Sequence, residues 1–249
     1  MIQPLGQRLL QQLPLAAASR IVDVGAGAGA LLPAIQRAAP GATVVGIDRS
    51  RGMLNLARAK HRGPLAVMDA QQLGLPDAQF DVAVAAFILF HLPHPERCLR
   101  EIWRVLRPGG AVGIVTWASE DPPFANSIWD EELAAAGARA VELPATDNRT
   151  SCNSTDKVTA LFEGARFDGT EVSTEQIEHR WPPPDHFEWH VRSTSRMRLM
   201  SLGDEDRRVC LGRIRDRLAG LDEDQHTFRG EVFVATAVRP SARHMEVPR

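Results

Sequence analysis

Residues 21–30, which read IVDVGAGAGA, constrain the fold more than any other part of this sequence. A β-branched run leads into three glycines at alternate positions, and residues 31–39 then have helical composition. Glycine lets a backbone turn tightly and approach a ligand closely, and the first N–H groups of a following helix are free to bind it. The pattern predicts a strand, a glycine turn and a helix start that hold a nucleotide-like cofactor.

Four further apolar runs and the helices between them extend this pattern. The runs cover residues 43–47, 64–68, 80–87 and 111–117, and helical spacing occupies residues 31–39, 50–62 and 95–106. Such alternation is typical of an α/β fold with a doubly wound, mostly parallel sheet and helices on both faces. Asp48 and Asp69 each follow a strand, so we expect both to meet the glycine turn at the ligand-binding edge.

After Trp117 the alternation of short strands and helices ends. Helical patterns occupy residues 126–136, 155–164 and 185–221, and residues 169–180 and 230–238 have strand patterns. We therefore expect one domain over residues 1–249, with a helical insertion before the last strand. Its predicted parts are an N-terminal helix in 1–19, a cofactor-binding core at 20–118, substrate-side insertions at 119–150 and 181–225, and a loose tail at 240–249.

Composition excludes several classes of function. The chain has 29 Lys and Arg against 31 Asp and Glu, and this balance gives no electrostatic footprint for nucleic acid or an anionic membrane. Its three cysteines form no CxxC pair, which fits reduced thiols in a cytoplasm. We find no signal peptide and no apolar run of about 18 residues, so the expected location is cytoplasmic and no membrane contact is expected.

The glycine motif alone leaves the cofactor open. Gly25, Gly27 and Ala30 also satisfy the dinucleotide pattern G-x-G-x-x-G/A, so an NAD(P)-dependent oxidoreductase is one alternative. Asp48 does not separate the two, because a carboxylate there binds ribose hydroxyls in either case. Asp23 does, since a carboxylate inside the turn attracts a cation and repels a pyrophosphate. Asp69 offers a further carboxylate to an adenine amino group.

Four sequence blocks, in register, carry a resemblance to a known family. They are VDVGAGAGA (22–30), VVGIDRSRGML (44–54), MDAQQLGLPDAQFDVAVAAFILFHLPHP (68–95) and LREIWRVLRPGGAVGIVTW (99–117). Here the chain resembles the class I S-adenosylmethionine-dependent methyltransferases, in particular those that act on small molecules. The resemblance implies a seven-stranded sheet whose last strand, at 230–238, is antiparallel. It also implies methyl transfer to an O, N or C nucleophile by in-line displacement, with S-adenosylhomocysteine as product.

The resemblance also implies roles for single residues. Asp23, Gly25, Ala26 and Gly27 would line the methionine part of the cofactor; Asp48, with Arg49 beside it, would hold the ribose; Met53, Asp69 and Ala70 would contact the adenine; Ala86 and Phe87 would touch the amino-acid end. His91 lies near the expected methyl position and is the candidate catalytic residue. Each has a structural alternative: Met53 as a core residue, Asp69 as a helix cap, and His91 as a hydrogen-bonded structural residue.

Substrate contacts are expected from aromatic residues beyond the core, because such side chains wall apolar or planar pockets. The candidates are Trp117, Phe124, Trp129, Trp181 and Trp189, and the alternative is a small core beneath the insertion. No metal is expected: His186 and His190 are spaced i, i+4, but no third ligand is evident. The expected partner is a small-molecule methyl acceptor, and the expected state is a monomer or a homodimer.

Two alternative functions remain at this point. About twenty residues precede the first strand, so the lid that covers the cofactor in many relatives is short, and no catalytic base is certain. A cofactor-binding protein without transfer activity is therefore one alternative, and the NAD(P)-dependent oxidoreductase is the other. A nucleic-acid methyltransferase is disfavoured by the neutral charge and by the AAFILF run that ends the fourth strand.

Overall fold

The computed structural model describes residues 2–140, 148–193 and 195–241. The chain divides into two compact units. The sheet unit comprises Met1–Ala118, Thr146–Glu175 and Val232–Arg249, and the helical unit comprises Ser119–Ala145 and Gln176–Glu231. The prediction that residues 1–249 form one domain stays a prediction. Most of the predicted tail, from residue 242, lies outside the described residues.

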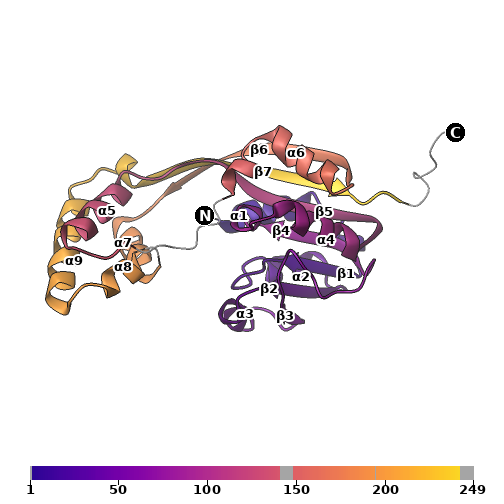
Figure 1. Cartoon of the computed structure of the whole chain (residues 1–249), viewed down its shortest axis with the longest axis horizontal. Coiled ribbons are helices and arrows are strands. Elements are labelled where there is room, and N and C mark those ends of the chain that lie inside the picture. The colour runs from indigo at the N-terminus through magenta and orange to yellow at the C-terminus, as the bar shows by residue number, and fades with distance from the viewer. Residues whose placement is uncertain (1, 141–147, 194, 242–249) are drawn as a thin grey trace. The chain divides into compact units, whose positions relative to one another are not determined.

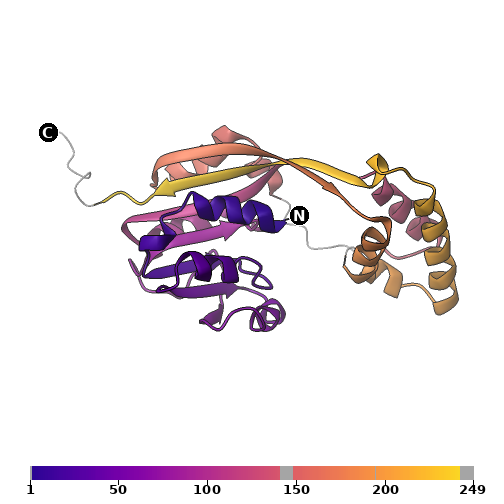
Figure 2. The same ribbon diagram turned by 180° about the vertical axis from the view of Figure 1, so that it is seen from behind.

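A seven-stranded sheet runs in the order β3-β2-β1-β4-β5-β7-β6 (Figures 1 and 2). The strands are β1 (Arg20–Val24), β2 (Thr43–Asp48), β3 (Leu65–Val67), β4 (Phe80–Ala86), β5 (Leu106–Asp121), β6 (Asp168–Arg180) and β7 (Thr227–Val238). The pairs β1–β2, β2–β3, β1–β4 and β4–β5 are parallel, whereas β5, β7 and β6 are antiparallel. The predicted fold class is therefore confirmed, including the antiparallel last strand.

The central strands are buried on both faces, as parallel strands between helices must be. Ile21, Val22 and Val24 of β1 have no exposed surface, and β4 is buried from Val82 to Ala85. Asp23 pairs in register with Gly46 of β2 and Val84 of β4, so it lies on β1, between these two strands and near the carboxyl end of β1. The carboxyl ends of the first four strands thus meet along one edge.

Five α-helices of the sheet unit accompany these strands: α1 (Ile2–Gln11), α2 (Leu32–Ala38), α3 (Arg51–Ala57), α4 (Pro95–Val105) and α6 (Thr155–Gly164). The α3 helix is shorter than the predicted 50–62. After Ala57 the chain turns, and the buried His61 ring reaches the carbonyl of Val44, with 3.0 Å between Nε2 and O. The ring fixes the chain against β2, which ends the helix early.

The inner face of α3 is narrow. Leu54 and Ala57 are buried, but Met53 is 45% exposed and Leu56 is 60% exposed. On a helix of seven residues only positions three apart share the face that covers the sheet. Met53 therefore does not lie in the core, which removes its structural alternative, and Leu56 also lies outside the face that covers the sheet.

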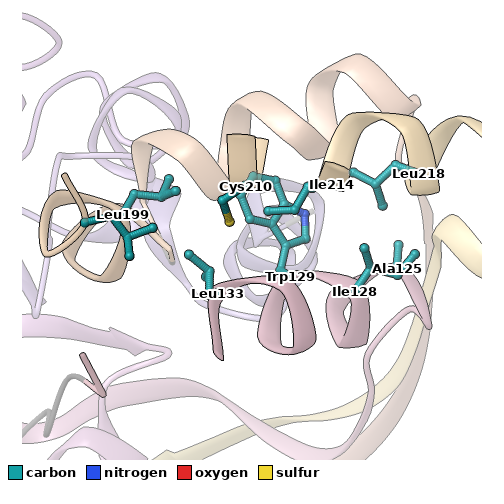
Figure 3. Packing of buried hydrophobic residues seen from close by; sticks show 9 residues of the cluster. Ala125, Ile128, Trp129, Leu133, Leu199, Cys210, Ile214 and Leu218 are labelled. Carbon is teal, nitrogen blue, oxygen red and sulfur yellow. The ribbon is translucent and has the colours of Figure 1, made fainter. Parts of the chain in front are cut away.

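The helical unit contains α5 (Ala125–Ala135), α7 (Pro183–Arg192), α8 (Arg196–Met200) and α9 (Asp204–Ala219). Figure 3 shows its core, a cluster of apolar side chains from α5, α8, α9 and the segment between α8 and α9. Its members are Ala125, Ile128, Trp129, Leu133, Leu199, Leu202, Cys210, Ile214 and Leu218. The predicted helical insertion is thus a set of packed helices with a hydrophobic core of its own.

Two further findings concern membrane spans and cysteines in the described residues. None of their helices is long and apolar enough to cross a membrane. Cys98, Cys152 and Cys210 are free thiols and all three are buried.

Candidate active site

The glycine turn follows β1 and is tied to the end of β2. The backbone N–H groups of Gly25 and Ala26 both donate to the carbonyl of Ile47, each with 2.8 Å between N and O. Gly25, Gly27 and Gly29 have φ angles of +78°, +54° and +73°, a region that disfavours side chains. A Cβ on Gly25 would lie 2.5 Å from Cδ1 of Ile88. Both the positive φ angle and this close approach therefore disfavour a larger residue at position 25.

Gly27 faces open space. A Cβ built on this residue would meet no atom within 4 Å among the described residues, whereas Gly25 and Gly29 are both crowded. The middle of the turn therefore presents bare backbone, where a ligand can approach closely.

Asp48 connects three elements at this edge. Its Oδ2 accepts a hydrogen bond from the N–H of Gly27 at 2.9 Å, and its Oδ1 accepts one from the N–H of Ser50 at 2.7 Å. The Ser50 hydroxyl in turn caps α3 by accepting from the N–H of Met53 at 3.3 Å. Because a carboxylate has about four acceptor positions, Asp48 keeps capacity for the hydroxyls of a diol. The neighbouring side chains of Arg49 and Met53 are exposed.

Asp23 is a buried acid beside the turn. Its side chain is only 2% exposed, and none of the described residues donates a hydrogen bond to its carboxylate. Burial, and secondly the charge of Asp48, raise the pKa of Asp23 to about 7. A buried carboxylate without a partner is stabilised by a positive charge, so this position suits a cationic ligand and opposes a pyrophosphate.

The segment after β3 carries Asp69 and the buried Ala70. Asp69 is exposed, and its Oδ1 accepts from the N–H of Gln71 at 2.9 Å while its carbonyl accepts from the N–H of Gln72 at 3.0 Å. Asp69 therefore closes a turn, and no helix of the described chain begins there, which removes the helix-cap alternative. One oxygen of its carboxylate is engaged by this turn and the other is available to a ligand.

Two residues of α4 hold the segment 69–77, and sequence reasoning missed both. The guanidinium of Arg104 donates to the carbonyls of Leu73 and Leu75 at 2.8 and 2.7 Å. Glu101 accepts from the N–H of Leu73 at 2.7 Å and pairs with Arg104 at 2.8 Å. Hydrogen bonding by Arg104 lowers the pKa of Glu101. The spacing of Glu101 and Arg104, i and i+3, is the only signal in the sequence that could have suggested the pair.

The end of β4 completes this edge of the sheet. Ala86 and Phe87 are half-buried, and the N–H of Phe87 donates to the carbonyl of Val115 at 2.8 Å. Phe87 has a φ of +58°, an uncommon conformation for a residue with a bulky side chain. Its ring lies 5.3 Å from that of Trp117, centroid to centroid. Trp117, predicted as a substrate contact, thus lies beside a predicted cofactor residue, and Ile88, which contacts Gly25, is a neighbour that sequence reasoning missed.

His91 lies in a short 3₁₀ helix, Leu89–His91, after β4. Its side chain is exposed, and its ring lies 4.2 Å from that of Phe90, centroid to centroid. Its backbone N–H donates to the carbonyl of Ile88 at 2.9 Å, which places it four residues past Phe87 on the same edge. The catalytic role of His91 stays a prediction.

The remaining predicted substrate residues belong to the helical unit. Trp129 lies in the core of that unit, 1% exposed, with its ring stacked on His190 at 4.6 Å. Phe124 and Trp189 are 53% and 41% exposed, and Trp181 lies 5.4 Å from Trp189 between ring centroids. The alternative of a small core therefore describes Trp129, whereas the other three have exposed surface for a ligand.

His186 and His190 do face one way, as their spacing suggested. Their Nε2 atoms lie 2.9 and 3.1 Å from the same atom, Oδ1 of Asn126. An amide oxygen only accepts, so both nitrogens carry hydrogen in this arrangement. Within the described ranges, no group of three or more His, Cys, Asp or Glu residues is placed to hold a metal ion.

Comparisons with known proteins agree with this geometry. A family model described as "Methyltransferase domain" matches residues 22–114. Residues 22–114 of this chain are similar to a methyltransferase domain. The chain is 39% identical over 109 residues to phosphatidylethanolamine N-methyltransferase of Cereibacter sphaeroides, covering 41% of this chain and 52% of that protein. It is 31% identical over 132 residues to demethylmenaquinone methyltransferase of Lactobacillus johnsonii, covering 50% and 54% respectively.

A solved structure shares the methyltransferase fold beyond the matched segment. Phosphoethanolamine N-methyltransferase 2 of Haemonchus contortus, in complex with phosphomonomethylethanolamine and S-adenosylhomocysteine, aligns with a TM-score of 0.55 and 20% identity over 96% of this chain and 53% of that one. At that identity the likeness shows the fold alone. The chain spans about half the length of the curated relatives it matches. S-Adenosylmethionine is the cofactor of this class of methyltransferase.

Proposed function

We propose that this protein transfers a methyl group from S-adenosylmethionine to a small-molecule acceptor. The observation that carries the proposal is Asp23, a buried carboxylate without a hydrogen-bond partner among the described residues, beside the open backbone of Gly27. A cationic, nucleotide-like ligand matches both features, since its positive end would stabilise the carboxylate and its main body would lie against bare backbone.

In this proposal, residues at the sheet edge hold the parts of the cofactor separately. Asp23, Gly25, Ala26 and Gly27 would hold the methionine end, and Ala86 and Phe87 would close it from the β4 side. Asp48 would accept from the ribose hydroxyls, with Arg49 beside it. Asp69 and Ala70 would contact the adenine edge, and the exposed Met53 side chain would cover the adenine face, in keeping with its position outside the core.

The cofactor, when bound, supplies a methyl group already activated by its sulfonium charge. The protein then needs to place a nucleophile about 3 Å from that methyl, in line, and to exclude water. A general base is required only where the nucleophile must lose a proton. His91 is the residue we propose for that task, because it is an exposed imidazole just beyond Phe87.

The acceptor is proposed as a small molecule with an oxygen, nitrogen or carbon nucleophile. The names of the two relatives above include both a phospholipid headgroup amine and a quinone, so family membership does not select the nucleophilic atom. A location in the cytoplasm and a monomeric or homodimeric state are further parts of this proposal.

Two alternatives are tested by the same experiments. An NAD(P)-dependent oxidoreductase would place a pyrophosphate at the glycine turn, beside the buried carboxylate of Asp23, whose negative charge would repel it. A cofactor-binding protein without transfer activity would bind S-adenosylmethionine and methylate nothing.

Calorimetric titration of the full chain decides between the cofactors. We expect saturable binding of S-adenosylhomocysteine and none of NAD; the reverse preference would refute the proposal. Transfer is then tested by incubating the protein with methyl-labelled S-adenosylmethionine and pools of amines, phenols, quinones and carboxylic acids. Label in a pool component supports transfer, whereas tight cofactor binding with no labelled product across the pools favours the protein without transfer activity.

A further inference from the structure

The candidate base His91 lies in a short segment that apolar side chains anchor inward. Leu89, Phe90 and Leu92 are buried, with 0%, 4% and 5% of their surface exposed, whereas His91 between them is exposed. Apolar packing is non-directional, so these anchors set how deeply the segment lies and not where the imidazole is directed. Directional contacts are needed to hold His91 in one place.

Asn148 supplies directional contacts on both sides of His91. Its side-chain Nδ2 donates to the carbonyls of Leu92 and Pro93, with 2.6 and 2.8 Å between N and O. Its backbone N–H donates to the carbonyl of Phe90 at 3.0 Å. A carboxamide nitrogen carries two hydrogens, so one Asn side chain can serve both carbonyls, which a carboxylate of the same size cannot do.

Asn148 is itself fixed by the turn that follows it. Its carbonyl accepts from the N–H of Ser151 at 2.9 Å and from the Ser151 hydroxyl at 2.6 Å. The next residue, Cys152, is buried, and its Sγ lies 3.1 Å from Oγ1 of the buried Thr116 on β5. Because β5 is the neighbour of β4 in the sheet, this turn connects Asn148 to a strand beside the proposed site.

Gln71 holds the far end of the same segment. Its Oε1 accepts from the N–H of His94 at 3.1 Å, and its Nε2 lies 3.4 Å from Oδ1 of Asp69. These contacts join the segment to the proposed adenine contact and do not involve Asn148. Loss of the Asn148 side-chain contacts would therefore release the backbone around His91, while the adenine side keeps its own hydrogen bonds.

We propose that Asn148 is a positioning residue, which holds the backbone on both sides of His91 so that the imidazole stays within reach of the acceptor's nucleophile. The proposal rests on the function proposed above, in which His91 takes the proton that this nucleophile loses. A displacement of about 1 Å lowers the rate of such a step about 100-fold, so these contacts have a measurable effect on transfer.

Asn148→Asp tests this role, because Asp has the size of Asn but lacks both donors. Its matched control is Asn153→Asp, which adds the same charge at an exposed position in the same segment, where the carboxylate keeps the contact with Nζ of Lys157. Methyl label transferred from S-adenosylmethionine to the pools of amines, phenols, quinones and carboxylic acids measures the rate, and calorimetry measures S-adenosylhomocysteine binding. Asn148→Asp should lower the rate at least about tenfold and keep the affinity within about twofold of wild type, and the control should change neither.

A signal from His91 itself separates positioning from general damage. In protein labelled with ¹³C at histidine, the Cε1–H resonance of His91 is identified by its absence in His91→Gln. That resonance should move in Asn148→Asp and keep its position in Asn153→Asp. An unchanged resonance or a wild-type rate in Asn148→Asp would overturn the proposal, as would a loss of S-adenosylhomocysteine affinity as large as the loss of rate.

The proposed function and the role of Asn148 fail in different ways. If the wild-type chain transfers no label, the proposed function fails, whereas the His91 resonance still decides whether Asn148 holds this segment. If Asn148→Asp does not fold, judged by its thermal melt, Asn148→Ala removes the donors without placing a charge beside two carbonyls, and the same measurements apply. In the wild type, the side-chain N–H groups of Asn148 should exchange with solvent more slowly than those of Asn153, and equal exchange rates would overturn the proposal.

Discussion

The carboxylate of Asp48 accepts a hydrogen bond from the backbone N–H of Gly27, with 2.9 Å between Oδ2 and N. The acid that ends β2 therefore holds the open middle of the glycine turn, while its other oxygen holds the N–H of Ser50 at the start of α3. One side chain orders the two segments that flank the proposed ribose position.

We expect Asp48→Ala to weaken binding of S-adenosylhomocysteine at least about tenfold, because hydrogen bonds to a charged group contribute about 1.5–3 kcal/mol. Calorimetric titration measures the change. Asp168→Asn is the matched control, since Asp168 is an exposed acid on β6, at the opposite edge of the sheet from β3. Wild-type affinity in the Asp48 variant would remove this residue from the site.

Asp23 predicts a pH dependence of cofactor binding. Its pKa is raised to about 7 by burial, so the carboxylate that attracts a cation is fully ionised only above that pH. The affinity for S-adenosylmethionine should therefore rise between pH 6 and pH 8. Asp23→Asn should bind more weakly and with no such rise. A wild-type pH profile that is flat over this range would contradict the role given to Asp23.

The ionised Asp23 carboxylate also lowers the free energy of unfolding of the protein without cofactor. Its folded pKa is above the ordinary value of 3.8, so the native state binds the extra proton and stability falls as pH rises from about 4 to about 7. At pH 8, Asp23→Asn should therefore raise the melting temperature while it lowers cofactor affinity. A lower melting temperature in this variant would show that the buried charge is not a source of strain.

The paired histidines of the helical unit predict acid sensitivity. Burial lowers the pKa of His186 to about 4 and that of His190 to about 3. Because the unfolded state protonates near pH 6.5 and the native state resists it, the free energy of unfolding should fall as pH drops from 6.5 to 4. Each histidine contributes at most about 1.4 kcal/mol per pH unit.

Urea titrations at pH 7 and pH 5, followed by tryptophan fluorescence, measure this loss. His190→Gln should reduce the difference between the two pH values, whereas His94→Gln, at an exposed position, should not. An equal pH dependence in all three proteins would place the acid sensitivity elsewhere.

Arg104 predicts a positioning effect on adenine recognition. It and Glu101 hold the segment that carries Asp69, so Arg104→Gln should let that segment move. The affinity for S-adenosylhomocysteine should fall about fivefold, which corresponds to about 1 kcal/mol of binding free energy. Binding of S-inosylhomocysteine, which has oxygen in place of the adenine amino group, should change much less.

The comparison of these two ligands separates positioning from general damage. Loss of folding would weaken both equally, and Arg100→Gln, an exposed arginine on the same helix, should weaken neither. If Asp69→Asn leaves the preference for S-adenosylhomocysteine over S-inosylhomocysteine unchanged, the proposed contact of Asp69 with adenine is wrong. If Asp69→Asn reduces this preference but Arg104→Gln leaves it unchanged, the positioning role of Arg104 is wrong.

Local sequence predicted the sheet and the glycine turn well. Strands and glycine turns are determined largely by residues close to one another in sequence. Because parallel strands place their carboxyl ends at one edge of the sheet, the positions of Asp23, Asp48 and Asp69 at that edge followed directly. The exposure of Met53 was not predictable, because it depends on where α3 ends, and that is decided by the contact of His61 with a distant strand.

Contacts between polar groups that are far apart in sequence could not be predicted from the sequence alone. Arg104 meets Leu73 across 31 residues and His190 meets Asn126 across 64, and neither pair leaves a periodic pattern. A single sequence shows periodicity and motifs, whereas pairings between distant residues can be seen only in the folded structure.

The order of the last strands has a consequence for synthesis. β7 lies between β5 and β6 in the sheet, although β6 precedes it in the chain. On the ribosome, β6 has no strand to pair with until residues 227–238 have emerged, so this edge of the sheet is completed only after the helices of the helical unit have been made. A nascent chain stalled before β7 would thus display an unpaired β6 and an open outer edge of β5, and chaperones protect such surfaces whereas aggregation exploits them.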